Sequence, residues 1–276
     1  MALDVTLLGT TTKVAIVTLR PGQVIYSEAG KFLFCSDDVV METKLSAPTA
    51  GGQAPAGAQG GGGMGGSGLG GLLRTAVDAG KRMAAGESLA FQHFHTRGGD
   101  GLLGLAGVIP GEMRALELDG RTTWFAEKDA FVAAEAGVNF DIAFSGLRQG
   151  FSGGEGFVLE KFTGSGTLLI GGAGDFIDIN PAEYGGRIRV DTGCVVAWDD
   201  RIRYGVERIG GLSRQGLMTA VLGGEGMSVA TLEGNGQVIL QSVTIDGLAK
   251  ALAKNAGAGD KKTGMGMGGI FSGSAD

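Results

Sequence analysis

The sequence predicts an all-β protein whose core is a double-stranded β-helix, or a set of stacked β-sandwich lobes, built from internal repeats. Three observations lead to this prediction. Short apolar and β-branched runs recur along the chain and are separated by turn residues. Glycine makes up 55 of the 276 residues, and many glycines stand singly between these runs. Two sequence units also recur three times each, which is typical of a core built by stacking copies of one structural unit.

The longer repeated unit aligns in three copies without gaps. Each copy starts with a strand that ends at an acidic residue, passes through a turn into an apolar run, and ends in another strand. The apolar runs begin in register at Phe32, Phe131 and Val195. The three copies begin at residues 25, 124 and 188, and they read IYSEAGKFLFCSDDVVME, WFAEKDAFVAAEAGVNFD and IRVDTGCVVAWDDRIRYG.

The shorter repeated unit is a glycine followed by a strand and a turn, which describes a β-hairpin. Its copies begin at residues 86, 154 and 224, and they read GESLAFQHF, GEGFVLEKF and GEGMSVATL. One copy is too small to bury its own apolar face, so neighbouring copies must stack to build the core. A plain Greek-key sandwich is the alternative architecture. Open strand edges in such folds are commonly closed by another subunit, so we expect a homo-oligomer.

Composition divides the chain into four segments. Residues 46–71 contain no charged side chain and are rich in glycine, which predicts a flexible loop because such a stretch buries little apolar surface. Two helices are expected where apolar residues recur at helical spacing. The expected segments are N-terminal strands of the β core over 1–45, the loop over 46–71, the repeated β core over 72–254 with short helices at 72–85 and 245–254, and a Gly-rich tail over 255–276.

Charge and cysteine content narrow the function classes. The net charge is −6, so the chain as a whole does not attract nucleic acid, and no nucleic-acid partner is expected. Cys35 and Cys194 lie inside apolar runs, which favours free thiols in a reducing compartment. No signal peptide is recognisable, and no run approaches the roughly 18 apolar residues of a membrane span. We expect a cytoplasmic protein, with association at a membrane surface as the alternative.

His93 and His95 are the residues best suited to a metal. Residues i and i+2 of a strand face the same side, so both imidazoles can meet one ion. With Asp100 and the flanking glycines they approximate the metal-binding pattern of cupins. That pattern needs a further histidine from a second motif, and this chain has only two histidines. We therefore expect a solvent-facing strand here and no metal ligand.

Two further sets of charged residues are candidates for a site. Each glutamate of one set follows a glycine at the start of the shorter unit, where a turn carboxylate accepting backbone N–H groups is the preferred interpretation. These residues are Glu87, Glu155 and Glu225. The other set stands at alternate positions of two successive strands and can form a basic stripe. It consists of Arg187, Arg189, Arg201 and Arg203. Acidic residues are interleaved with these arginines, which favours cross-strand salt bridges over a phosphate-binding face.

Catalysis has little support in the sequence. No serine or cysteine lies in a recognisable nucleophile motif, and two adjacent histidines supply a triad poorly. The Gly-rich stretch lacks the lysine and the hydroxyl residue of a phosphate-binding loop. We therefore expect no enzyme activity, no catalytic residue and no cofactor.

The chain also resembles the altered-inheritance-of-mitochondria protein 24 family, as a bacterial member, over residues 13–253. The resemblance rests, in chain order, on PGQVIYSEAGKFL with VVMET, KRMAAGESLAFQHF, GGEGFVLEKFTGSGTLLI, and GNGQVILQSV followed by IDGLAKAL. It implies a double-stranded β-helix like that of the tryptophan RNA-binding attenuator protein, and no known catalytic activity. Mitochondrial members of the family are linked to inner-membrane organisation and to the integrity of respiratory complexes. The long Gly-rich insertion and the tail depart from the family pattern.

These observations favour a non-catalytic, self-assembling structural or scaffolding protein. The first alternative is a peripheral membrane-organising protein that uses the Gly-rich loop and the helix over 72–85. That helix carries Arg74, Lys81 and Arg82 against Asp78, a basic balance suited to a lipid surface. The second alternative is a degenerate cupin-like metal protein, which would rest on the two histidines.

Overall fold

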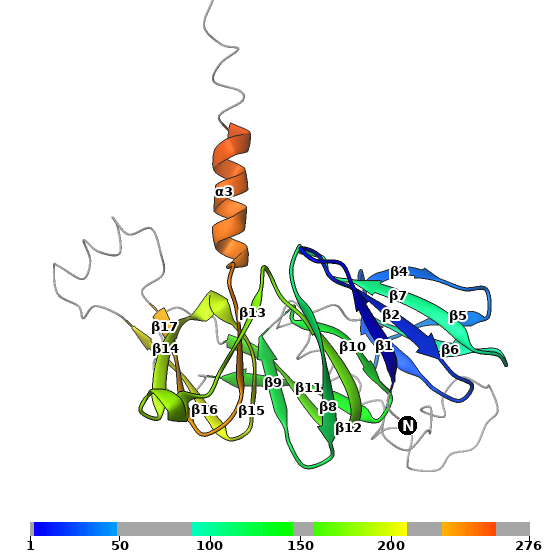
Figure 1. Ribbon diagram of the computed structural model, residues 1–276, viewed down its shortest axis with the longest axis horizontal. Coiled ribbons are helices and arrows are strands. Elements are labelled where there is room, and N and C mark those ends of the chain that lie inside the picture. Colours follow the sequence, from blue (N-terminus) through cyan, green and yellow to red (C-terminus); the bar gives the residue numbers. More distant parts are fainter. Residues whose placement is uncertain (1–2, 49–89, 128, 146–156, 209–227, 258–276) are drawn as a thin grey trace, which may run out of the picture.

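A computed structural model describes five stretches of the chain (Figure 1), namely residues 3–48, 90–127, 129–145, 157–208 and 228–257. Most of the predicted Gly-rich loop, the predicted helix over 72–85 and most of the tail lie outside these stretches. The helix expected at 245–254 is α3 (Ile245–Gly257). The all-β prediction is confirmed at the level of a mostly β protein, in which every pair of named strands is antiparallel.

The strands fall into three repeats, preceded by β1 (Asp4–Leu8). The first repeat contains β2 (Val14–Leu19), β3 (Ile25–Glu28), β4 (Phe32–Cys35), β5 (Val39–Lys44), β6 (Phe91–Thr96) and β7 (Gly101–Ala106). The second contains β8 (Met113–Asp119), β9 (Trp124–Glu127), β10 (Phe131–Glu135), β11 (Val138–Ser145) and the long β12 (Phe157–Gly171). The third contains β13 (Phe176–Ile179), β14 (Arg187–Asp191), β15 (Val195–Asp199), β16 (Ile202–Arg208), β17 (Ser228–Gly234) and β18 (Val238–Gln241).

One pairing scheme recurs in all three repeats. In the first repeat, β7 pairs with β2 and β4, while β6 pairs with β3 and β5. In the third repeat, β18 pairs with β13 and β15, while β17 pairs with β14 and β16. In the second repeat β12 fills both places, because residues 165–171 pair with β8 and β10 whereas residues 157–164 pair with β9 and β11. The repeated sequence units therefore correspond to repeated strand pairings.

Two strand pairs join the repeats. β3 of the first repeat pairs with β10 of the second, and β9 of the second pairs with β15 of the third. Each junction unites three strands of one repeat with three of the next. The two six-stranded sections that result have the strand orders β8-β12-β10-β3-β6-β5 and β13-β18-β15-β9-β12-β11.

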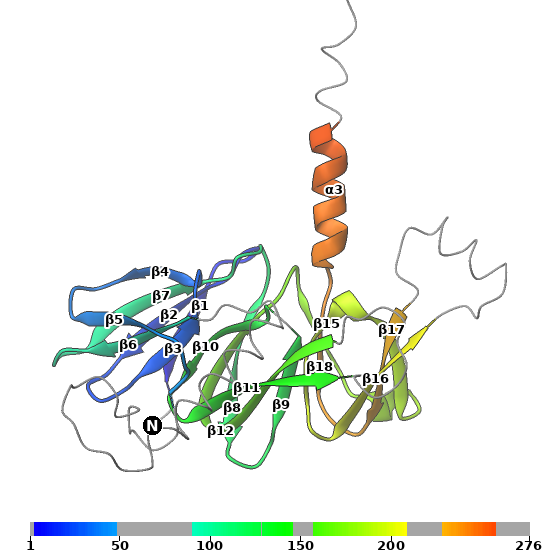
Figure 2. The ribbon, with the colours of Figure 1, turned by 180° about the vertical axis from the view of Figure 1, so that it is seen from behind.

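Two smaller sections remain at the ends of the molecule. One has the order β1-β2-β7-β4, and the other has the order β14-β17-β16. Figures 1 and 2 show them at opposite ends of an elongated body, with the second repeat between them. Within the described residues, β4 and β14 each pair on one side only.

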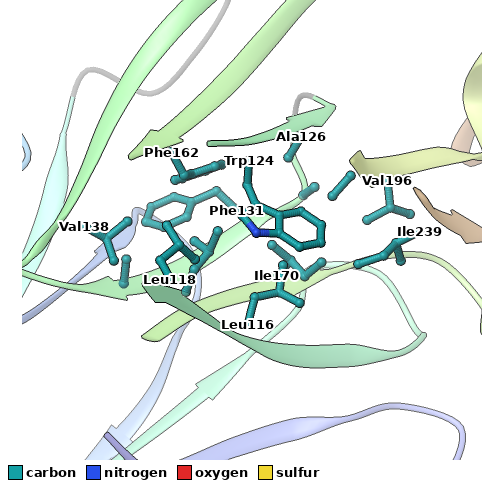
Figure 3. Packing of buried hydrophobic residues seen from close by; sticks show 14 of the residues in the cluster. Leu116, Leu118, Trp124, Ala126, Phe131, Val138, Phe162, Ile170, Val196 and Ile239 are labelled. Carbon is teal, nitrogen blue, oxygen red and sulfur yellow. The ribbon is translucent and has the colours of Figure 1, made fainter. Parts of the chain in front are cut away.

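Three apolar clusters form the core. The middle cluster is rich in aromatic side chains, and Figure 3 shows Phe131, Phe162 and Trp124 packed with aliphatic residues from neighbouring strands. The rings of Phe131 and Phe162 have centroids 5.4 Å apart, a spacing at which aromatic pairs attract. The other two clusters lie in the first and third repeats. Strands at the repeat junctions contribute to clusters on both faces, so β3, β10 and β15 are almost wholly buried.

α3 stands apart from this β core. Both views show it projecting away from the strands, and its side chains are exposed along nearly all of its length (Figures 1 and 2). Thr244 starts it as the N-terminal cap, with its hydroxyl accepting the backbone N–H of Gly247 at 3.1 Å. None of the described helices has the length and hydrophobicity that a membrane crossing requires.

Candidate functional site

The two histidines share β6, but His93 is engaged in a structural contact. Its Nε2 lies 2.9 Å from the carbonyl oxygen of Ser46, and its ring centroid is 6.1 Å from that of Tyr26. The expected solvent-facing strand is wrong for His93, because Tyr26 and the chain at Ser46 cover the ring. Burial lowers the pKa of His93, which keeps the imidazole neutral.

The other residues of the cupin-like pattern do not complete a metal site with His93. His95 is half-buried, and Asp100 is exposed beyond the end of β6. Over the stretches that the structure describes, no three His, Cys, Asp or Glu side chains come together in a way that could hold a metal ion. The pattern that looked cupin-like in sequence therefore brings two imidazoles to one strand, where the neighbouring carboxylate, Glu42 of β5, is paired with Lys44.

The structure describes only one of the two charged sets, the four arginines. Glu87, Glu155 and Glu225 all lie outside the described residues. Among the arginines, Arg187 and Arg189 both contact the carboxylate of Glu207 on β16, and Arg189 Nε is 3.1 Å from Glu207 Oε2. The single carboxylate offsets one of the two positive charges of this pair of arginines.

The other two arginines lie on or beside β16. Arg201 pairs with Asp199, whose carboxylate is completely buried. Arg203 is exposed and lies opposite Glu233 in the register of β16 and β17. The four arginines therefore do not form one continuous basic surface.

A cavity of about 330 Å³ lies where the three repeats meet, and sequence reasoning missed it. Lys31 is buried at its wall, with Nζ 3.7 Å from Glu28 Oε2 and 3.4 Å from the carbonyl oxygen of Asp129. Lys13 and Glu112, which also line the cavity, form a second pair at 3.9 Å. Among the described residues, the lining contains no serine, cysteine or histidine. Through these contacts Lys31 and Lys13 link residues of the first repeat to residues of the second.

The most distinctive surfaces lie at β4 and β14, each an edge strand of one end section. On β4, the large apolar side chains of Leu33 and Phe34 are exposed, and the Phe34 ring rests on Gly104, where an added Cβ would come within 2.4 Å of it. Beside β14 lies a groove of about 530 Å³. Its apolar lining comes from Ile177, Ile179, Tyr184, Ile188, Val190 and Leu240. An exposed strand edge flanked by apolar side chains is a template for pairing with another strand.

Comparison with known proteins places this architecture in a family. The family model described as mitochondrial biogenesis AIM24 matches residues 5–243, which span the described strands from β1 to β18 and stop just before α3. The chain belongs to the AIM24 family. This confirms the resemblance seen in the sequence.

Two proteins of Streptococcus pyogenes are similar to this chain. The uncharacterized protein M6_Spy0233 of a serotype M6 strain is 28% identical over 239 residues, which cover 86% of this chain and 84% of that protein. The crystal structure of protein SPYM3_0169 superposes with a TM-score of 0.65 at 24% identity, over 92% of this chain and 99% of that one. The second likeness shows that the two chains share a fold.

Proposed function

We propose that this AIM24 protein is a non-catalytic structural protein that self-assembles into a scaffold. One observation carries the proposal. Three repeats produce two complete six-stranded sections and two incomplete end sections, in which the β4 edge carries exposed apolar side chains and the β14 edge borders an apolar groove. Open edges beside apolar surface promote strand pairing between chains, because their backbone N–H and C=O groups have no partner strand. Assembly between copies of the chain covers them.

The strand order within a repeat supports the finer fold assignment. The first, sixth and third strands lie on one side of each core, and the second, fifth and fourth strands lie on the other. The chain thus alternates between two triplets as it advances, which is the course of a double-stranded β-helix. We infer three such lobes stacked side by side, and this arrangement favours the repeat architecture over a plain Greek-key sandwich.

A reducing, cytoplasmic setting accompanies this proposal. Cys35 and Cys194, the two cysteines of the chain, are thiols and do not form a disulfide with each other. They lie on β4 and in the short turn before β15, in the first and third repeats. Cysteines kept apart in this way suit a compartment where thiols stay reduced.

The solution mass tests self-assembly most simply. Light scattering on the full chain is expected to give a multiple of 27.9 kDa. A variant that lacks residues 51–71 is expected to give the same multiple, because both open edges lie in the β core. A mass of one chain at every concentration from micromolar to millimolar would contradict the proposal. A multiple that collapses on the deletion would transfer assembly to the Gly-rich segment.

Contact with a membrane surface is the second candidate function, and α3 favours it. Ile245, Leu248 and Leu252 recur on one side of this projecting helix, with Lys250 and Lys254 nearby. We expect co-sedimentation with vesicles containing phosphatidylserine, and loss of it when Leu248 and Leu252 are both replaced by aspartate. Equal binding of the variant and the native chain would exclude α3 as the contact.

A further inference from the structure

The third strands of the three repeats, β4, β10 and β15, occupy equivalent places. Each has a β-bulge at the same point, between Phe32 and Phe34, between Phe131 and Ala133, and between Val195 and Ala197. Two of the three, β10 and β15, also pair on their outer side with the second strand of the preceding repeat. β4 belongs to the first repeat, and no described strand pairs with it in this way.

The side chains on β4 show what this difference means. Leu33 and Phe34 are 50% and 40% exposed. Their equivalents on the other third strands are at most 2% exposed, and they are Val132, Ala133, Val196 and Ala197. Val132 and Ala133 are buried in the core cluster of the first repeat, next to Ile25 of β3. Leu33 and Phe34 thus carry apolar surface in the place where the internal junctions bury it against a preceding repeat.

The opposite end of the molecule offers the complementary cavity. Ile188 of β14 is the sequence equivalent of Ile25, which is fully buried. Ile188 is only partly buried, and it lines the groove beside β14 with the exposed Ile177. The first and second repeats fill the corresponding place with the third strand of the next repeat. Among the described residues no strand fills this place in the third repeat, where the groove lies.

We propose that a second copy of this chain supplies the missing strand. β4 of one copy pairs antiparallel with β14 of the next, and Leu33 and Phe34 enter the groove lined by Ile177, Ile188 and Leu240. The proposal specifies the partner and the surface for the self-assembly proposed above, and it rests on that function. Because the two surfaces differ, the contact is head-to-tail and propagates until it closes a ring or extends a filament.

The junction between copies is more polar than the internal ones. Arg189 stands where β3 has Tyr26 and β9 has Phe125, and it is paired with Glu207. In the assembly the guanidinium keeps the ion pair with Glu207 that it shares with Arg187, while its stem contributes apolar contact. This difference makes the contact between copies weaker than the contacts between repeats, so assembly depends on protein concentration.

The internal junctions also fix the register. Ala133 lies opposite Ser27 at the first junction, and Ala197 lies opposite the equivalent Ala126 at the second. The same register between copies places Phe34 opposite Val190 and Cys35 opposite Arg189. Directly opposed residues of antiparallel strands have Cα atoms about 4.5–5.5 Å apart, a separation that a disulfide spans.

Oxidative cross-linking of the full chain tests this register. Arg189→Cys with the native Cys35 is expected to give a ladder of covalent dimers, trimers and larger species on a non-reducing gel, with most of the protein cross-linked. Arg187→Cys is the matched control, because it lies on the same strand and face but two residues out of register. The native chain and the double variant Cys35→Ser with Arg189→Cys are expected to stay uncross-linked.

The outcomes separate this inference from the proposed function. Equal cross-linking at positions 187 and 189, or dimers that persist after Cys35→Ser, would overturn the head-to-tail register. An oligomer by light scattering in which Arg189→Cys forms no disulfide with Cys35 would also overturn it, and self-assembly would then stand on another surface. A monomer by light scattering at every concentration would remove both proposals.

Discussion

The carboxylate of Asp199 accepts the backbone N–H of Gln237 at 2.8 Å and so fastens the end of β15 to the start of β18. The same link occurs in the other repeats. Glu135 accepts the N–H of Thr167 at 2.7 Å, and the Ser36 hydroxyl accepts the N–H of Leu102 at 3.0 Å. In each repeat a different side chain therefore accepts a hydrogen bond from the equivalent backbone N–H group. This bond ties the third strand of the repeat to the sixth.

Asp199 is expected to be the strongest of these links. It is fully buried and also accepts the backbone N–H of Arg201 at 3.0 Å. Asp199→Ala leaves these donors without a partner, so we expect the free energy of unfolding to fall by about 2–3 kcal/mol in urea titrations. Asp175→Ala is the control, because Asp175 is exposed. Equal effects of the two substitutions would show that Asp199 is not a structural link.

His93 is expected to make stability depend on pH. Its pKa is lowered in the folded protein by burial, so the unfolded chain binds the proton more readily below the ordinary pKa of about 6.5. Stability is then constant above about pH 6.5 and falls as the pH drops towards the folded value. Thermal unfolding should show a smaller loss between pH 7.5 and pH 5.5 for His93→Asn than for the native chain. His95→Asn is the control, and an unchanged loss in His93→Asn would refute the assignment.

The middle core is expected to tolerate truncation poorly. Leu168 is 1% exposed within the aromatic cluster, and Leu168→Ala should cost about 2–5 kcal/mol of unfolding free energy. Leu252→Ala removes the same atoms from the exposed side of α3 and should change stability by less than about 0.5 kcal/mol. Chemical denaturation of both variants gives the comparison. Similar losses would mean that α3 is packed in solution.

Much of the fold is predictable from the sequence because the repeats carry it. The alignment of Phe32, Phe131 and Val195 correctly identifies β4, β10 and β15 as equivalent strands. The polar residues after each apolar run include Ser36, Glu135 and Asp199, which link the third and sixth strands. The joining of repeats through β3 with β10 and β9 with β15 is a tertiary property. The local sequence pattern does not reveal which strands pair between repeats, because an edge strand and an interior strand can have the same pattern of apolar residues.

The candidate site was harder to predict for the same reason. Leu33 and Val132 look equivalent in sequence, and only their burial distinguishes an open edge from an internal junction. His93 and His95 are candidates for a metal site in the sequence because imidazoles are common metal ligands. The structure shows instead that His93 is buried against the carbonyl oxygen of Ser46, a contact between residues 47 positions apart that no local spacing reveals.

We expect copies of the chain to assemble through β4, and the mass of a single β4 variant tests this expectation most directly. Leu33→Asp places a charge on β4, whereas Leu8→Asp places one on β1, an equally exposed site at the opposite side of the same section. Light scattering at one concentration should show an oligomer for the native chain and Leu8→Asp, and a mass near 27.9 kDa for Leu33→Asp. An oligomer of native size in Leu33→Asp would contradict the account.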